Sequence, residues 1–417
     1  MLKHCLQKHS TPLPKGRGKS CVAAWGWGFL FLLVTLVKII PGLGSVYTFH
    51  IYPTIARLLS PIPNIIPFAV GDLFIAASIA WVIAYPIYSI AIKKKKKLPT
   101  LLRVTEYLLW VYVWFYAAWG LNYSQPNIYS RLRMRPVEVQ DSTFRTFAYR
   151  YADSLNTAYQ TASSLSNISY IIASSLSNVA EVSGLRSNHR QQSSMRKTLS
   201  NNWMLRRPET SATDKNKIKL ITHKTVLQGY NSLKDMGINR PFNPHAHAKT
   251  MIFSHLSSMA GITGSMGPFF CEFTINADVL PHDYPATYAH EYAHFLGIAN
   301  EGEANFYSYI VCTSSNVPIV RFSGYYEIFF HVLHNVRDLL GEAEYKEYLR
   351  HIRPEIIRLA ESDRQYWLSR HSPIVDTTQN FFYNLYLKGN RVEGGMKSYS
   401  GVIGIIMAWE KRESMVH

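Results

Sequence analysis

The chain has 417 residues, 47% of them hydrophobic and 17% charged, and a formal net charge of +17. This length accommodates one large domain or two ordinary ones. The four cysteines, at positions 5, 21, 271 and 312, form no CxxC pair and exclude a dense disulfide framework. Much of the positive charge lies in the N-terminal tail and in the run Lys93 to Lys97, both beside apolar stretches, so membrane topology explains it better than nucleic-acid binding. A basic surface between Arg186 and Lys249 is the alternative, but we expect no nucleic-acid partner.

Three apolar segments occupy the first part of the chain, over residues 22–40, 68–92 and 104–121. The first is about 19 residues long, close to the roughly 20 that a helix needs to cross the hydrocarbon core. A cleaved signal peptide is the rival interpretation, but no small-x-small cleavage site follows and two more apolar segments come next. Asp72, near the start of the second segment, is expected to face protein or the interface rather than lipid. The sequence therefore predicts three transmembrane helices.

The distribution of lysine and arginine sets the expected orientation. Five of these residues precede the first apolar segment, the loop over residues 41–67 holds only Arg57, and the lysine run follows the second segment. Because short loops rich in Lys and Arg stay in the cytoplasm, residues 1–21 are expected to form a basic cytoplasmic tail. Three crossings then place residues 126–417 outside the cytoplasmic membrane.

The remainder of the chain has a largely helical pattern. Residues 183–217 are rich in Ser, Asn, Arg and Gln and predict an exposed, flexible excursion. Between residues 251 and 276, Gly and Ser interrupt an apolar run, which indicates a small strand element. From Asp283 onward the pattern is typical of successive helices.

The sequence His290-Glu291-Tyr292-Ala293-His294 has the HExxH pattern. On a helix, residues four apart share a face, so His290 and His294 can both direct an imidazole nitrogen at one ion. Glu291 is displaced by about 100° around the helix and can accept a proton from a metal-bound water without binding the metal itself. This is the arrangement of zinc peptidases, in which the metal activates water and polarises the substrate carbonyl. The pattern predicts a zinc site with Glu291 as general base.

The residues around this pattern favour a site over a coincidence. By composition alone, such a match arises about 0.03 times in a chain of this length. Residues 284–296 fit a helix, with Asp283 as N-cap, Pro285 in the first turn and Gly297 as its stop. The alternative is a helix whose two histidines and carboxylate bind nothing.

A catalytic zinc site needs a third protein ligand. Gly297 extends the pattern to HExxHxxG, as in the metzincins, but the position of their third histidine holds Asn300. Two carboxylates follow, Glu301 and Glu303. We expect Glu303 to be the third ligand, because it opens a helical segment, residues 303–312, that can pack against the first helix after a tight turn. Glu301 is the alternative, and the carboxylate that does not bind the metal is expected beside it or at the helix N-terminus, where the dipole favours negative charge.

Other side chains are weaker candidates for the active site. Four of them could donate a hydrogen bond to the oxyanion of a tetrahedral intermediate, although each type is more often structural: Tyr325, Tyr326, His331 and His334. Lys388 and Asn390 belong either to a cleft or to a helix C-terminus with its cap.

Two further pairs of residues are candidates for metal binding or for a disulfide. His245 and His247 form an HxH pair, for which exposed loop histidines are favoured over a second metal site. Cys271 and Cys312 either meet in the fold or are two small buried hydrophobic residues. Neither pair changes the prediction of a site at the HExxH helix.

Four motifs give the chain a resemblance to a known family. They are AWGLNY at residues 118–123, the HExxH and EANF pair, RFSGY at residues 321–325 and YLKGN at residues 386–390. Together they resemble an uncharacterised bacterial family, the domain of unknown function number 3810. The resemblance implies three N-terminal spans, a zinc-peptidase-like domain and a gluzincin-like metal site with Glu303 of EANF as a ligand. It implies no substrate, and residues 183–217 have no counterpart in it.

The sequence therefore predicts a membrane-anchored zinc metallopeptidase in the cytoplasmic membrane of a bacterium, with His290, His294 and Glu303 holding zinc and Glu291 as the base. Its expected substrate is a peptide or protein outside that membrane, and an amide of cell-wall peptides is a close variant. The alternative is a non-catalytic, membrane-anchored binding protein with a structural or vestigial zinc site. A transporter fits poorly, because three spans leave little room for a pathway. The expected fold is mainly α, with three N-terminal transmembrane helices and a largely helical zincin-like domain that has a small strand element before the HExxH helix.

Overall fold

The computed structural model describes residues 30–40, 42–137, 141–164, 212–373 and 401–416, together with the single residues 28 and 375. Some sequence expectations lie outside these residues, namely the tail over residues 1–21, most of the excursion over residues 183–217, and Lys388 and Asn390. The end of the expected excursion differs from the prediction, because residues 212–217 belong to the first turns of a helix, α11.

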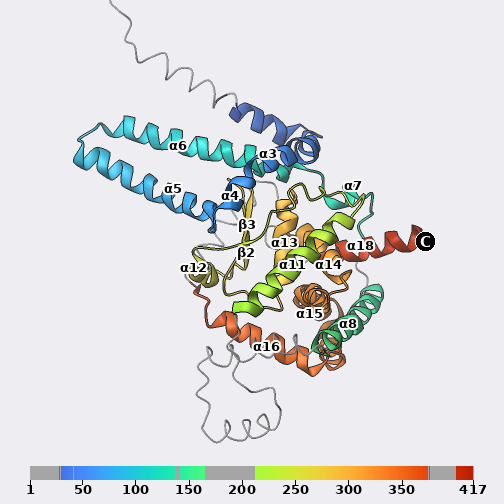
Figure 1. The fold of residues 1–417 in the computed structure, drawn as a ribbon. Helices are drawn as coiled ribbons and strands as arrows, with labels where there is room; N and C mark the ends of the chain where they lie inside the picture. Colours follow the sequence, from blue (N-terminus) through green and yellow to red (C-terminus); the bar gives the residue numbers. More distant parts are fainter. Residues whose placement is uncertain are drawn as a thin grey trace, which may run out of the picture.

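The body of the protein is built around α13 (Tyr284–Phe295), the helix that carries the HExxH pattern (Figure 1). Nearly all of its residues are buried. Three helices pack directly against it, namely α11 (Ala212–Ser232), α14 (Glu301–Thr313) and α15 (Pro318–His351). The other helices of the body are α8 (Asp141–Ser164), which packs on α15, α18 (Gly401–Val416), which packs on α14, and α16 (Pro354–Leu368). The expectation of a mainly α fold is confirmed.

Local sequence signals explain both ends of α13. Pro285 lies in the first turn, where a helix does not need the backbone N–H that proline lacks. Gly297 lies just beyond the last turn with a φ of 96°, a left-handed conformation that glycine adopts without steric cost and that commonly ends helices. Asp283 is the N-cap residue, as expected, but its side chain makes no capping hydrogen bond. The expected helix over residues 284–296 is confirmed to within one residue.

A small three-stranded sheet packs against α13. Its strands are β1 (Lys249–Thr250), β2 (Gly264–Gly267) and β3 (Glu272–Ile275), in the order β1-β3-β2, with β1 parallel and β2 antiparallel to the central β3. Every residue of β3 is buried, and the ring of Phe273 packs against that of Tyr292 in α13. β2 is therefore an edge strand next to the HExxH helix. The strand element expected before this helix is confirmed.

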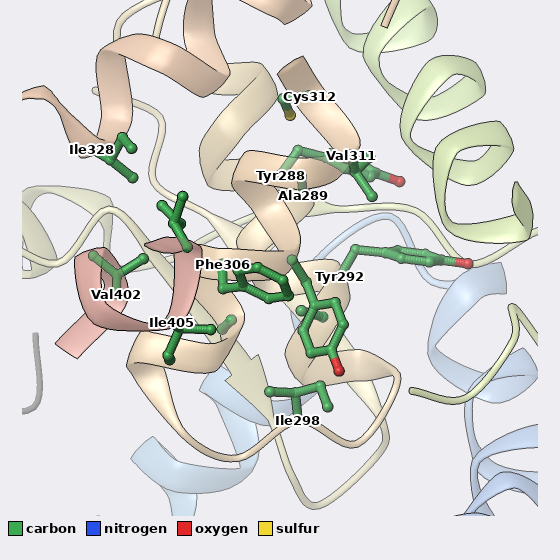
Figure 2. Packing of buried hydrophobic residues seen from close by; sticks show 14 of the residues in the cluster. Tyr288, Ala289, Tyr292, Ile298, Phe306, Val311, Cys312, Ile328, Val402 and Ile405 are labelled. Atoms are coloured by element: carbon green, nitrogen blue, oxygen red, sulfur yellow. The ribbon is translucent and has the colours of Figure 1, made fainter. Parts of the chain in front are cut away.

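One hydrophobic core joins α13 to α14, α15 and α18, and Figure 2 shows part of it, with Tyr292, Phe306 and Ile405 close together. Gly324 lets α14 and α15 approach closely, because a Cβ added at this glycine would lie 2.5 Å from the Cβ of Cys312. This packing fixes the positions of α13, which carries the HExxH pattern, and of α14, which carries Glu301 and Glu303.

A long helical hairpin extends from this body (Figure 1). Its helices are α5 (Val70–Ile87), which continues as a π-helical turn, η2 (Tyr88–Ile92), and α6 (Lys97–Ala118). The stretch Val70–Ile92 is long and apolar enough to cross a membrane, and only 6% of its most apolar part is buried. Since an apolar helix exposed to this degree is unstable in water, the finding supports association with a membrane.

The prediction of three transmembrane helices is not confirmed. Among the described residues, Val70–Ile92 is the helix that could cross a membrane by itself, whereas Leu30–Ile39 passes the same test only together with Leu43–Ile65, from which it is bent by 116°. The expected loop over residues 41–67 is largely helical: α2 (Leu43–Val46), η1 (Tyr47–Ile51), α3 (Tyr52–Leu59) and α4 (Pro61–Ile65). These helices pack into the body, since Tyr52 is fully buried there.

The third expected segment, residues 104–121, is helical but less apolar than α5. Arg103, Glu106 and its many Trp and Tyr residues lower the mean hydropathy of α6. The last turns of α6 are also partly buried against the body, at Val113, Tyr116 and Ala118. After a 3-10 turn, η3 (Gly120–Ser124), and the short helix α7 (Ile128–Arg131), the chain enters the body.

The N-terminal part is tied to the C-terminal end of α13. The last carbonyls of a helix have no partner within the helix. The hydroxyl of Tyr52 donates to the carbonyl oxygen of Phe295 at 2.7 Å, and the indole Nε1 of Trp119 donates to the carbonyl oxygen of His294 at 2.9 Å. The base of the hairpin and the HExxH helix therefore share one hydrophobic core and one set of hydrogen bonds.

Candidate active site

The histidines of the HExxH pattern lie one turn apart on α13, and their Nε2 atoms are 3.0 Å from each other. The opposite ring nitrogen of each is held by an oxygen. His294 Nδ1 lies 2.6 Å from the carbonyl oxygen of Ile298, and His290 Nδ1 lies 2.6 Å from the side-chain oxygen of Asn305. The structure therefore brings the two imidazoles together on one face of α13, as the spacing of the pattern predicts.

These hydrogen bonds determine which nitrogen carries the proton. A carbonyl oxygen only accepts, so in the neutral ring of His294 the proton is on Nδ1 and the lone pair is on Nε2. The side-chain oxygen of Asn305 has the same effect on His290. Two lone pairs only 3.0 Å apart repel each other unless a cation or a proton lies near both. Metal-binding histidines are oriented in the same way by an acceptor on their other nitrogen.

The carboxylate that joins the two histidines is Glu301. Its Oε2 lies 3.1 Å from Nε2 of His290 and 3.4 Å from Nε2 of His294. One ligand atom from each of these three residues lies within 4.8 Å of the others. Two imidazoles and a carboxylate are a donor set that suits zinc and leaves a fourth position open.

Glu303, the third ligand expected from the sequence, lies elsewhere. Its Oε1 accepts a hydrogen bond from the backbone N–H of Ile128 at 2.8 Å, and its Oε2 forms a buried ion pair with Arg131 at 2.6 Å. The structure therefore brings Glu301, and not Glu303, to the histidines. Glu303 instead anchors α7 to the N-terminus of α14.

The phase of α14 explains this difference. Asn300 is the N-cap, and its side-chain oxygen accepts from the backbone N–H of Glu303 at 3.1 Å. Glu301 is the first helical residue, and Glu303 lies two residues, or about 200°, further around the helix. Asn305 lies four residues after Glu301 and shares its face, so both point toward His290.

Glu291 lies in the same cleft without joining the three ligands. Its Oε2 is buried and, among the described residues, has no hydrogen-bond partner. Its carboxyl group packs against the backbone of β2 at Gly264, where an added Cβ would overlap it. An unpaired buried carboxylate oxygen is costly, so its position here is consistent with a role toward a bound molecule.

Burial and charge act against each other in this site. Burial lowers the pKa of His290, but the hydrogen bond and charge of Glu301 outweigh this effect and raise that pKa to about 10. Burial raises the pKa of Glu291 to about 7, against the lowering effect of the two nearby histidines. Burial also acts to raise the pKa of Glu301, yet His294 and His290 hold it well below its usual range. The site thus stabilises a negative Glu301 beside positive charge, which a divalent cation also provides.

The three candidate ligands and Glu291 line a cleft of about 630 Å³. Its walls come from α13, α14 and α15 on one side, from residues 260–266 on another, and from the end of α6 and η3. Outside residues 260–266, the remaining side chains that line it and that carry aromatic rings or polar groups are Phe115, Trp119, Tyr123, Thr287, Asn305, Glu327 and His331. No Lys or Arg is among the described residues that line this cleft.

Of the four side chains that the sequence offers as donors to an oxyanion, one lines the cleft. His331 lines the cleft, one helical turn after Glu327. Tyr326 instead donates to Asp363 at 2.5 Å, and His334 pairs with Asp338 on the exposed side of α15. Tyr325 does not line the cleft either, and its ring packs against that of Tyr151. Sequence reasoning missed Glu327, although its spacing of four from His331 on a helix would have paired the two residues.

The other candidate residues lie away from the cleft. His245 and His247 are on a loop, where Nδ1 of His247 contacts the carbonyl oxygen of His245 at 2.9 Å. Cys271 and Cys312 are both free and buried, so the interpretation as two small buried residues is confirmed over a disulfide.

A second group of potential ligands lies near the start of α13, formed by His282, Asp283 and Asp363. His282 is fully buried, and its Nε2 lies 2.8 Å from Asp363 Oδ2 and 3.5 Å from Asp283 Oδ1. The hydroxyl of Tyr326 donates to the same oxygen of Asp363. Nε2 of the imidazole thus has carboxylate partners within the protein, so we interpret the group as a buried link between the start of α13 and α16.

A comparison with protein families gives one match. The profile of a family described as "Protein of unknown function (DUF3810)" matches residues 47–407. The chain belongs to the DUF3810 family. The match includes the hairpin, the sheet and the helices α13 to α16 of this DUF3810 member, so the site and the hairpin belong to one family unit. No match was found among curated proteins or among solved structures.

Proposed function

We propose that this DUF3810 protein is a membrane-anchored, zinc-dependent metallopeptidase. In this proposal His290, His294 and Glu301 hold the zinc ion, and Glu291 is the general base. The observation that carries the proposal is the convergence of one ligand atom from each of His290, His294 and Glu301 within 4.8 Å, beside the unpartnered carboxylate oxygen of Glu291.

The residues of the cleft have complementary parts in such a reaction. A zinc ion bound by three protein ligands lowers the pKa of water and polarises a substrate carbonyl. Glu291 accepts the proton of the attacking water and passes it to the leaving amine, and its pKa of about 7 suits both transfers near neutral pH. Burial lowers the pKa of His331, so its ring is neutral and can donate an N–H to the developing oxyanion.

The proposed membrane arrangement follows from the hairpin and its charges. Both α5 and α6 cross the bilayer, and the turn at Lys93 to Lys97 lies on the cytoplasmic side, since short loops rich in lysine are retained there. The body and its cleft then lie on the outer side of the cytoplasmic membrane. The substrate is a peptide or protein in that compartment.

The catalytic part of the proposal is tested by Glu291→Gln in the full-length protein. This variant should keep its zinc, because Glu291 is not a ligand, and should lose hydrolysis by about 10²–10⁴-fold. Metal content is measured on the purified protein in lipid nanodiscs. Hydrolysis is measured by comparing envelope peptides, by mass spectrometry, in cells that carry either form.

The matched control is Glu344→Gln, which changes the same side chain on the surface of α15, where Glu344 pairs with Arg145. It should leave zinc and hydrolysis unchanged. Hydrolysis by Glu291→Gln at the wild-type rate would reject Glu291 as the base. Zinc in the wild type without any peptide that depends on Glu291 would support a non-catalytic zinc-binding protein instead.

A further inference from the structure

Exposed apolar side chains lie on the segments next to the base of the hairpin. On the turn before α12 (Ser254–Met259), Ile252 and Phe253 are 39% and 43% exposed, and Leu256 within α12 is 56% exposed. Ile62 and Ile65 on α4, and Phe68 between α4 and α5, are also exposed. We call these six residues the apolar collar. Clustered exposed side chains of this kind mark a contact surface more often than scattered ones do.

The apolar collar continues the apolar surface of α5. The backbone N–H of Ile252 donates to Oδ2 of Asp72 in the first turn of α5, at 2.8 Å. In Figure 1, α12 lies close to the end of α5 that joins the body. The turn between β2 and β3 is at the same level, since the ring of Phe269 packs against that of Phe74 in α5.

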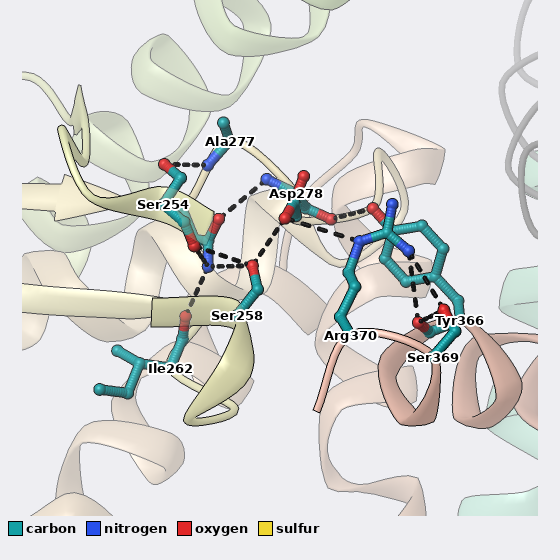
Figure 3. Close-up of polar contacts among 9 residues, drawn as sticks. Ser254, Ser258, Ile262, Ala277, Asp278, Tyr366, Ser369 and Arg370 are labelled. Carbon is teal, nitrogen blue, oxygen red and sulfur yellow. Dashed lines mark hydrogen bonds and ion pairs between the residues drawn. The ribbon is translucent and has the colours of Figure 1, made fainter. Parts of the chain in front are cut away.

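The exposure of α12 is not a sign of a loose segment, because a polar network fixes its other side (Figure 3). The side-chain amide of Asn276 donates to Ser258 Oγ at 2.9 Å and to the carbonyl oxygen of Ile262 at 2.8 Å. Ser258 in turn donates to Asp278, which also lies 3.5 Å from the guanidinium of Arg370. The fold therefore holds the apolar side of α12 outward in a defined position.

We propose that the apolar collar lies in the headgroup region of the bilayer that the hairpin crosses. The 23 residues of Val70–Ile92 rise by about 35 Å, which is close to the thickness of the hydrocarbon core. The base of α5 is then at the membrane surface, and residues hydrogen-bonded to its first turn are at the same depth. Short helices with one apolar face bind at this depth through the burial of that face.

This placement brings the cleft to the lipid surface. Residues 260–263, which follow α12 directly, form one edge of the cleft, and Phe115 and Trp119 near the end of α6 form another. On the proposed peptidase activity, the substrates within reach are polypeptides held in the same membrane. The membrane placement itself does not depend on that activity, and its test measures no hydrolysis.

The test uses the full-length chain with Cys5 and Cys21 replaced by serine, since Cys271 and Cys312 are buried. Phe253→Cys is labelled with the fluorophore NBD and reconstituted into vesicles of phosphatidylcholine and phosphatidylglycerol. The matched control is Met415→Cys with the same label, on α18, which lies far from the hairpin in Figure 1 and where Met415 is 73% exposed.

We expect lipids that carry a nitroxide near the headgroup to quench the label at position 253 by about twofold, and iodide in the water to quench it little. The label at position 415 should show the reverse pattern. Equal quenching of both labels by iodide would overturn the proposal. So would a change in emission at position 253 that depends on the ratio of protein to lipid instead of on the lipid quencher, because that result assigns the surface to a contact between protein copies.

Discussion

At the scale of single residues, the choice between Glu301 and Glu303 depends on where α14 begins. Asn300 caps the helix, so Glu301 takes its first position and faces the histidines, while Glu303 faces Arg131. From the sequence we expected this helix to begin at Glu303, two residues too late, although asparagine followed by acidic residues is typical of a helix start and would have indicated one at Glu301. The partner of Glu303 was not visible, since Arg131 is more than 170 positions away in the chain.

Gly264 gives a prediction at the same scale. An added methyl group would overlap the carboxyl group of Glu291, which is buried and has little space to move. Gly264→Ala should therefore displace Glu291, keep the zinc and reduce hydrolysis by about 10–10²-fold. The control is Gly401→Ala at the start of α18, where the added group meets open space. Zinc content and peptide turnover are measured for both, and full activity of Gly264→Ala would show that this contact does not position the base.

At the scale of elements, α13 is held at both ends. Its C-terminal carbonyls accept hydrogen bonds from the N-terminal part of the chain, at Tyr52 and Trp119. Near its N-terminus, His282 links it to Asp363 of α16. The HExxH helix is thus a fixed support, which is what the two proposed ligands and the proposed base on this helix need for constant geometry.

The link at His282 makes stability depend on pH. Burial lowers the pKa of His282, but the charges of Asp283 and Asp363 outweigh this and raise it to about 9. A raised pKa in the folded state means that the ion pair of His282 with Asp363 contributes fully below about pH 6.5 and is lost as the pH rises through about 9. Burial raises the pKa of Asp283 to about 7, so the pair with Asp363 is the one that remains at pH 6. His282→Asn should therefore lower the midpoint of thermal unfolding most at pH 6 and progressively less toward pH 10.

The measurement is the difference in unfolding midpoint between wild type and variant across this range, in detergent. His334→Asn is the control, because His334 forms an exposed i,i+4 pair with Asp338, and such pairs contribute little. A difference for His282→Asn that does not change with pH would show that His282 is not charged in the folded protein.

The elements also show how far sequence reasoning reaches. The HExxH helix, its proline, its terminal glycine and the preceding strands were predictable, because each depends on local patterns. The loop expected over residues 41–67 is helical because Tyr52 and Ala56 are buried in a core formed with distant helices. The part of the cleft wall near the end of α6 could not be predicted either, since no local pattern shows that Trp119 contacts His294.

At the scale of the whole molecule, the hairpin and the body lie on either side of one expected boundary. The lysine run lies at the far end of the hairpin from the body (Figure 1). If both hairpin helices cross the bilayer, the lysines and the cleft are on opposite sides of the membrane. The one helix that could cross by itself, Val70–Ile92 among the described residues, is consistent with this arrangement but does not fix the direction.

Labelling of single cysteines fixes the direction. In cells with a permeabilised outer barrier, a maleimide that cannot cross the inner membrane should label Met415→Cys on the body. It should label Lys95→Cys in the hairpin turn only after the inner membrane is opened. The two positions are both exposed, so reactivity itself is matched. Labelling of Lys95→Cys in intact cells would reject the proposed orientation.

The proposed function depends above all on a zinc site made by His290, His294 and Glu301. The most direct measurement is the zinc content of the purified full-length protein, compared between Glu301→Gln and Glu303→Gln. We predict about one zinc ion per wild-type chain, a loss of at least about tenfold in zinc affinity for Glu301→Gln, and retained zinc with lower stability for Glu303→Gln, whose partner is Arg131. Absence of zinc from the wild type, or loss of zinc in Glu303→Gln with retention in Glu301→Gln, would contradict the account.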